Sequence, residues 1–266
     1  MVDCLLNKDY YRDYCDRFNG VWEWLSSLSY NKEAVSEEIC EFRNYTSDYM
    51  YEGLISAGFI KVPSETDLSK LSNNAFKDLG LINSEGNFLL SGRYTFPVRD
   101  MVGNVIALIG WYPDEKKYIT TPSVLFSKSG MFFGMEQLSE TGINDKYFLV
   151  EGIFDCLSLR ALGFNCVAQM GSSSSLHKEV LYGLFKRIVA VPDADGTGRK
   201  VVESDLWHVP YGSSYMNWSQ KSGKGGKKKK FIKDVDDFCK YYDKETLVDL
   251  FSDVLLDDER IISFEI

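Results

Sequence analysis

Acidic residues follow two apolar runs, at the points where strands are expected to end. Glu151 comes directly after the run Tyr147–Val150, and Asp193 and Asp195 come just after the run Arg187–Val191. Ligand sites of parallel α/β sheets lie outside the carboxyl ends of the strands, so the three carboxylates are expected to meet at one edge. Clustered carboxylates repel one another, and hard oxygen ligands suit Mg²⁺ or Mn²⁺. The pattern therefore predicts a divalent metal site.

The residues between the two runs must position these acids. Ile153 to Leu162 has the spacing of a helix that Gly163 ends, which predicts a β-α-β-α crossover and an α/β fold. An Asp-x-Asp-Gly sequence by itself is more typical of an Asx or glycine turn than of a metal site. Its pairing with Glu-Gly at an earlier strand end favours the metal interpretation.

Further residues of this stretch match a known domain. Glu151-Gly152 is followed by Asp155 one helical turn on, and the second acidic group is followed by Arg199. Between them, Gln169–Ser174 is similar to the Gly-Thr-Ser turn of DnaG-type primases. The stretch resembles the TOPRIM domain, the metal-binding fold of DnaG-type primases, type IA and type II topoisomerases and several nucleases. The resemblance implies a mostly parallel sheet flanked by helices.

The residues before this domain resemble the subdomain that precedes it in the catalytic core of DnaG-type primases. The matching segments, in the same order, are Gly92–Asp100, Gly103–Gly110, Lys117–Pro122 and Phe126–Met135. A TOPRIM domain alone leaves the reaction open, whereas this second match selects primase. The whole resemblance covers roughly residues 75 to 240.

The resemblance also implies a set of basic residues that bind nucleotide and template. Lys117 and Lys128 are similar to the lysines that face the template and incoming nucleotide, and Arg99 and Arg199 are further candidates. Without the family pattern, each lysine would be interpreted as a solvent-exposed charge at a strand end. The chain has Trp111 where the family usually has arginine, so one phosphate contact is missing or supplied elsewhere, and the indole could stack a base instead.

A second acidic segment, Asp234-Val235-Asp236, resembles the Asp-Pro-Asp element that ends the family's metal site. Valine in place of proline keeps the spacing of the carboxylates but loses the fixed φ. An acidic helix N-terminus is equally consistent with this pattern, because it interacts well with the helix dipole. The metal ligands implied by the resemblance are Glu151, Asp193, Asp195, Asp234 and Asp236. Whether Glu151 is a ligand or a general base is left open.

The composition is that of a folded protein. The chain has 266 residues, of which 44% are hydrophobic and 14% aromatic, and no apolar run approaches the roughly 20 residues that span a bilayer. Six scattered cysteines without a Cys-x-x-Cys pair argue against a zinc site and a disulfide framework. The net charge of −9 argues against coating nucleic acid by overall attraction. The segment Lys221–Lys230 is either a basic contact for nucleic acid or a solvated loop.

The chain is expected to divide into a helical region over residues 1–60, a primase-like α+β subdomain over 61–143 and the TOPRIM domain with C-terminal helices over 144–266. An aromatic stripe from Tyr10 to Leu25 is predicted to be core, and the helical region is interpreted as either a partner-docking surface or a cap on the strand meander. Later in the chain we predict a strand over residues 207–211 and a loop over 212–230.

The leading hypothesis is a stand-alone DnaG-like primase core, of the phage or mobile-element kind, with neither zinc ribbon nor helicase module. It would synthesise short RNA primers on single-stranded DNA from ribonucleoside triphosphates, in the cytoplasm and with no membrane. A replicative helicase or another replication protein is the expected partner. The alternatives are a TOPRIM nuclease, then a topoisomerase, and a non-catalytic accessory or inhibitor protein.

Overall fold

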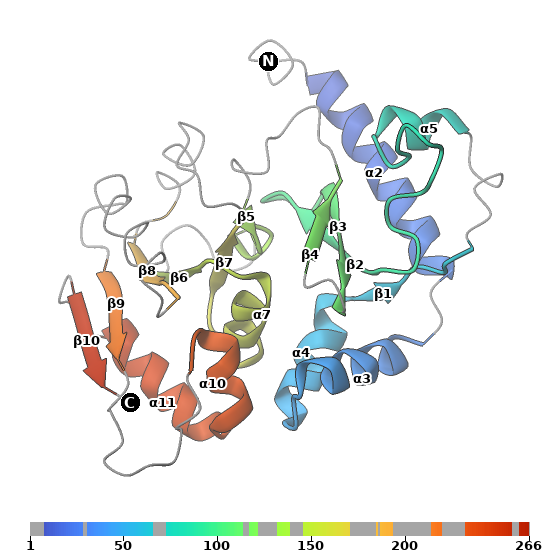
Figure 1. Cartoon of the computed structure of the whole chain (residues 1–266). Helices are drawn as coiled ribbons and strands as arrows, with labels where there is room; N and C mark the ends of the chain where they lie inside the picture. Colours follow the sequence, from blue (N-terminus) through green and yellow to red (C-terminus); the bar gives the residue numbers. More distant parts are fainter. Residues whose placement is uncertain are drawn as a thin grey trace. The chain divides into compact units, whose positions relative to one another are not determined.

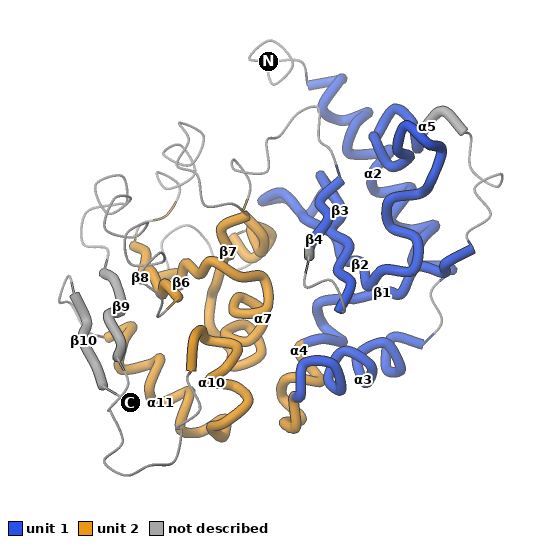
Figure 2. Tube along the Cα trace, viewed as in Figure 1, with its two compact units in different colours: residues 1–44, 54–128 blue, residues 45–53, 129–266 orange. Residues whose placement is uncertain are grey.

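The computed structural model describes residues 8–28, 31–65, 73–113, 117–121, 132–138, 146–170, 185, 187–193, 214–219, 232–256 and 261–265. The chain forms two compact units (Figure 2). Unit 1 comprises residues 1–44 and 54–128, and unit 2 comprises residues 45–53 and 129–266. The domain boundaries after residues 60 and 143 stay a prediction. No helix in the described part of the chain is both long and apolar enough to cross a membrane.

The elements follow one another as labelled in Figure 1. The helices are α2 (Lys8–Leu28), α3 (Lys32–Arg43), α4 (Asp48–Ala57), α5 (Asn73–Asp78), α7 (Ile153–Ala161), α10 (Val235–Tyr241) and α11 (Lys244–Leu256). The strands are β1 (Ile60–Lys61), β2 (Tyr94–Arg99), β3 (Val105–Tyr112), β4 (Lys117–Thr120), β5 (Phe132–Phe133), β6 (Lys146–Val150), β7 (Cys166–Gln169), β8 (Arg187–Val191), β9 (Ser214–Ser219) and β10 (Ile261–Glu265).

In unit 1, helix α2 covers the strand meander with its predicted apolar stripe. Tyr14, Phe18 and Leu25 are buried, while Tyr10 at the start of the stripe is 42% exposed. The Tyr14 hydroxyl donates a hydrogen bond of 3.0 Å to the carbonyl of Ile106 in β3. The prediction that the stripe is core is therefore confirmed for Tyr14, Phe18 and Leu25 and wrong for Tyr10. The buried contacts support the cap interpretation of this helix.

The sheet of unit 1 is antiparallel, with the strand order β1-β2-β3-β4. The turn between β2 and β3 is held by Asp100, whose Oδ1 accepts hydrogen bonds of 2.9 Å from the N–H groups of Val102 and Asn104. Gly103 has φ +89°, a value that side-chain-bearing residues rarely adopt. Strands β2, β3 and β4 form the strand meander expected before the TOPRIM domain.

The sheet of unit 2 has the order β10-β9-β8-β6-β7-β5, and every neighbouring pair is parallel except β5 with β7. Both faces of β6 are covered. Phe148 contacts Phe164 and Phe251 on one face, while Tyr147 packs against Phe185 on the other. Burial on both faces explains why β6 and β8 are continuous apolar runs rather than alternating ones. The predicted α/β fold with a mostly parallel sheet is confirmed.

The predicted organisation of the C-terminal part was partly wrong. A six-residue strand, Ser214–Ser219, lies inside the segment predicted as a loop. It pairs in parallel with β8 on one side and with β10 on the other, and β10 was not predicted. The neighbouring glycines and lysines favour a loop in the sequence, and pairing with two strands outweighs that local preference. The strand predicted over 207–211 lies outside the described residues.

Cys15, Cys156, Cys166 and Cys239 are buried and Cys40 is half-buried, and all five are free thiols.

Candidate functional site

Two neighbouring parallel strands deliver acidic residues to one edge of the unit 2 sheet. Val150 of β6 pairs with Val191 of β8, so Glu151 and Asp193 leave the sheet at its carboxyl end. The side chain of Asp193 is 16% exposed. The expectation that the two strand ends share an edge is confirmed. Asp195 and Arg199 lie outside the described residues.

Gly152 leaves room for a carboxylate. Its φ of −98° is open to any residue, so backbone freedom is not the reason for glycine here. A Cβ atom at this position would overlap the carboxylate of Asp155 in the first turn of α7. Glycine at position 152 therefore leaves the space that the Asp155 carboxylate occupies. Asp155 is 7% exposed.

The second acidic segment lies at the start of α10. Asp234 caps this helix, and its side chain accepts a hydrogen bond of 2.9 Å from the N–H of Asp237. The cap fixes the start of the helix without the proline that the family usually has. Oxygens of Asp234, Asp236 and Asp237 all lie within 4.8 Å of one another. Asp237 was not predicted as a member of the site, although its spacing from Asp234 is that of a helix cap pair.

The strand-end acids and the α10 acids form one electrostatic cluster. Burial raises the pKa of Asp155 well above its ordinary value, and the charges of Asp234, Asp236 and Asp193 raise it further. Burial is also the main cause that raises the pKa of Asp234 to about 6, with contributions from Asp237, Asp236 and Asp193. Asp193 therefore acts on both groups, which places the end of β8 beside the start of α10.

Asp236 is held by donors of the protein itself. Its side chain is 2% exposed, and its Oδ2 lies 2.6 Å from the Nζ of Lys240 one turn along α10. The hydroxyl of Tyr45 donates a hydrogen bond to Oδ1. Lys240 also lies 3.1 Å from Asp237 and 5.9 Å from the ring centroid of Tyr45. Neither Tyr45 nor Lys240 was predicted, because nothing in their local sequence marks a contact with the acidic segment.

A second lysine contacts one of the strand-end acids. The Nζ of Lys233 lies 2.6 Å from Oδ2 of Asp193. The backbone N–H of the same lysine donates a hydrogen bond of 3.0 Å to Asp237. Lys233 thus connects the end of β8 to the segment that begins α10.

Two of the predicted basic residues lie in the sheet of unit 1. Arg99 ends β2, and its Nη1 donates a hydrogen bond of 2.8 Å to the carbonyl of Gly103 in the following turn. Lys117 begins β4, with its Cα opposite that of Tyr112. Lys128 and the segment Lys221–Lys230 lie outside the described residues.

Trp111 does not offer its ring to a base. It is 4% exposed, and its ring centroid lies 5.6 Å from that of Tyr94. The stacking interpretation of this residue is therefore wrong. The side chain of Arg93 packs against the neighbouring Gly110, and its Cδ would lie 2.8 Å from a Cβ at position 110. The guanidinium carbon of Arg93 lies 5.7 Å from the ring centroid of Tyr112.

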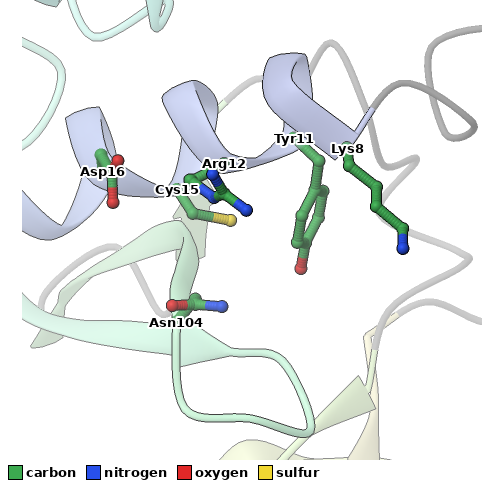
Figure 3. A pocket seen from close by; sticks show the side chains of 6 residues that line it. All are labelled: Lys8, Tyr11, Arg12, Cys15, Asp16 and Asn104. Atoms are coloured by element: carbon green, nitrogen blue, oxygen red, sulfur yellow. The ribbon is translucent and has the colours of Figure 1, made fainter.

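Unit 1 also contains a pocket of about 360 Å³ beside α2 (Figure 3). Its lining residues are Lys8, Tyr11, Arg12, Cys15, Asp16 and Asn104. Basic and acidic side chains both line it, so its charge selects neither an anion nor a cation. It contains none of the acids of the unit 2 cluster.

Comparisons with known proteins agree with this geometry. Residues 148–220 match a family model described as Toprim-like. The chain is 32% identical over 125 residues to the DNA primase of Deinococcus radiodurans, covering 44% of this chain and 22% of the relative. It is 32% identical over 190 residues to the DNA primase of Rickettsia bellii, covering 64% of this chain and 31% of the relative. The chain therefore spans less than a third of the length of either relative.

A solved structure covers nearly the whole chain. The DnaG primase catalytic domain bound to single-stranded DNA matches with a TM-score of 0.68 at 19% identity, covering 93% of this chain and 83% of that chain. This likeness extends over both units. The chain thus has the mixed α/β fold of a DnaG primase catalytic core, including a Toprim domain.

Proposed function

We propose that the chain is the catalytic core of a DnaG-type DNA primase, which synthesises short RNA primers on single-stranded DNA. The observation that carries this proposal is the acidic cluster at the carboxyl edge of a parallel sheet, within the fold of a primase catalytic core. Sequence similarity to two DNA primases supports the same reaction.

The described acids fit a divalent cation. All are carboxylates, the oxygen donors that Mg²⁺ and Mn²⁺ prefer, and mutual repulsion contributes to the raised pKa values of Asp155 and Asp234. The proposed ligands are Glu151, Asp193, Asp195, Asp234 and Asp236. Asp236 already contacts Tyr45 and Lys240, yet each carboxylate oxygen has a second lone pair for a cation. Bound Mg²⁺ or Mn²⁺ would supply neutralising charge and Lewis acidity toward a triphosphate.

In the proposed reaction, the 3′-hydroxyl of the growing primer attacks the α-phosphorus of a ribonucleoside triphosphate, and pyrophosphate leaves. The acidic cluster would hold the divalent cation, and the bound cation would neutralise negative charge on the triphosphate. We assign the contacts to phosphates of nucleotide and template to Arg99, Lys117, Lys128 and Arg199. Positive side chains are needed there because a net charge of −9 gives the chain little overall attraction for DNA.

The same charge argument supports the proposed partner. A protein with weak non-specific affinity for its template gains most from a partner that raises the local template concentration. We therefore propose that a replicative helicase or another replication protein stimulates priming. We also propose that the chain is the phage or mobile-element form of such a primase.

The test is incubation of the full chain with single-stranded DNA, four labelled ribonucleoside triphosphates and Mg²⁺ or Mn²⁺. Primase activity gives labelled oligoribonucleotides. Asp193→Asn with Asp195→Asn should abolish them and also remove Mn²⁺ binding in a calorimetric titration. Shortened DNA without labelled product would instead identify a nuclease. The absence of both products would favour a non-catalytic accessory protein.

A further inference from the structure

The two lysines of the acidic cluster differ in how firmly they are held. Lys240 is 17% exposed and contacts two carboxylates of its own helix, as well as the Tyr45 ring. Its partner Asp236 is 2% exposed. Breaking such a buried pair leaves a desolvated charge behind, which is strongly unfavourable. Lys240 is therefore a permanent counter-ion of the cluster.

Lys233 is held much less firmly. Its side chain is 48% exposed, and its ammonium group lies 2.6 Å from the carboxylate of Asp193. It comes from the extended segment before α10 rather than from a helix. Water therefore reaches the lysine side of this ion pair and hydrates a released ammonium, while a divalent cation that takes its place keeps the Asp193 carboxylate, which is 16% exposed, neutralised. This ammonium can leave Asp193 at low cost.

Asp193 is also one of the proposed cation ligands, so an ammonium and a divalent cation compete for the same carboxylate. We propose that Lys233 is an exchangeable internal counter-ion that competes with the divalent cation for Asp193 and then binds the triphosphate of the incoming nucleotide. This rests on the proposed function, because it requires a cation at Asp193.

Charge also determines where the released ammonium goes. Once released, the ammonium remains tethered beside Asp234, and a triphosphate brought to the cluster offers it negatively charged oxygens in place of the Asp193 carboxylate. When the cation binds without nucleotide, it displaces Lys233 from Asp193 and the lysine gains no new partner. When the cation binds together with nucleotide, the displaced lysine binds the triphosphate. Lys233 thereby couples the two binding events, and such coupling acts equally in both directions.

The test compares Mn²⁺ affinities of the full chain by calorimetry and by electron paramagnetic resonance of free Mn²⁺. Lys233→Met should bind Mn²⁺ about three- to tenfold more tightly than the wild type, because competition by a nearby positive charge is removed. Lys233→Arg keeps the charge and should stay near the wild type. Lys77→Met, on α5 of unit 1, removes the same charge and should change nothing.

A second titration repeats the comparison with a saturating ribonucleoside triphosphate present. The advantage of Lys233→Met over the wild type should then disappear. Mn²⁺ binding by Lys233→Met that equals or falls below the wild type, at an unchanged urea midpoint, overturns the competition. An advantage that persists with nucleotide overturns the transfer to phosphate. No Mn²⁺ binding by the wild type overturns the proposed metal site itself, and this outcome is distinct from the other two.

Discussion

The carboxylate of Asp155 accepts a hydrogen bond of 2.8 Å from the backbone N–H of Asp236, which lies 81 residues further along the chain. This bond joins the first turn of α7 to the first turn of α10. Each of these helices follows a segment that carries proposed ligands, Glu151 on one side and Asp234 on the other. Asp155 is thus a positioning residue that holds the two halves of the cluster together.

The first prediction concerns that bond. Asp155→Asn keeps an oxygen that can accept from the Asp236 N–H and removes a charge that burial disfavours. It should leave the chain at least as stable as the wild type at pH 7. Asp155→Ala leaves the buried N–H without its acceptor and should cost about 1–3 kcal/mol. Urea unfolding measures both, and equal destabilisation by the two variants would contradict the positioning role.

A second prediction concerns pH. The pKa of Asp234 is raised from 3.8 to about 6, mainly by burial, so between these values the folded state binds a proton that the unfolded state does not. Stability from this group therefore increases as pH falls from 7 to 5, by about 1 kcal/mol, and is lost as pH rises through 6. Asp234→Asn caps helices equally well and should lack this increment. Urea titrations of both proteins at the two pH values make the comparison, and identical pH dependences would refute it.

The third prediction concerns the hydrogen bond that the Tyr45 hydroxyl donates to Asp236. Tyr45→Phe removes the hydroxyl that donates to this buried carboxylate and should cost about 1.5–3 kcal/mol, because the bond involves a charged acceptor. Tyr49→Phe is the matched control, since its hydroxyl bonds the neutral carbonyl of Cys239 at a longer 3.3 Å. The control should cost less than half as much in the same thermal or urea unfolding experiment. Equal decreases in the free energy of unfolding for the two variants would show that the Tyr45 hydrogen bond stabilises the chain no more than the Tyr49 bond does.

The fourth prediction concerns the room left by glycine. Gly152→Ala places a Cβ against the Asp155 carboxylate and should destabilise the chain by about 1–3 kcal/mol while weakening Mn²⁺ binding. Gly20→Ala is the control, because this glycine lies inside α2 with nothing within 4 Å of a Cβ. It should stabilise the chain by about 0.5–1 kcal/mol. An alanine tolerated at 152 without either loss would show that the carboxylate can move aside.

Much of the fold could be predicted because local sequence and tertiary structure agree. The run that became β8 is apolar throughout, and burial on both sheet faces is the structure that such a run favours. Helix α3 begins after Asn31, whose side chain accepts the N–H of Glu33 as an N-cap should. The acids Glu151 and Asp193 were recognisable because each ends a strand of this kind.

The remainder depends on contacts that local sequence does not encode. Strand β9 exists through pairing with β8 and β10, in a segment whose own composition favours a loop. Tyr45 and Asp236 are 191 residues apart, so no spacing rule connects them. The burial of Trp111 could not be predicted either, since an aromatic residue in a strand is compatible with both a core and a binding surface.

Residues 45–53 belong to unit 2, whose other residues are 129–266. This separation along the chain constrains the order in which the chain can fold during synthesis. Gly53 approaches Ala161 so closely that a Cβ there would lie 2.6 Å from the alanine Cβ. Tyr45 leaves the ribosome 191 residues before its partner Asp236. At about 5–20 residues per second, this segment must wait on the order of ten to forty seconds for the last of its contacts. Unit 2 therefore cannot be completed until Asp236 has left the ribosome.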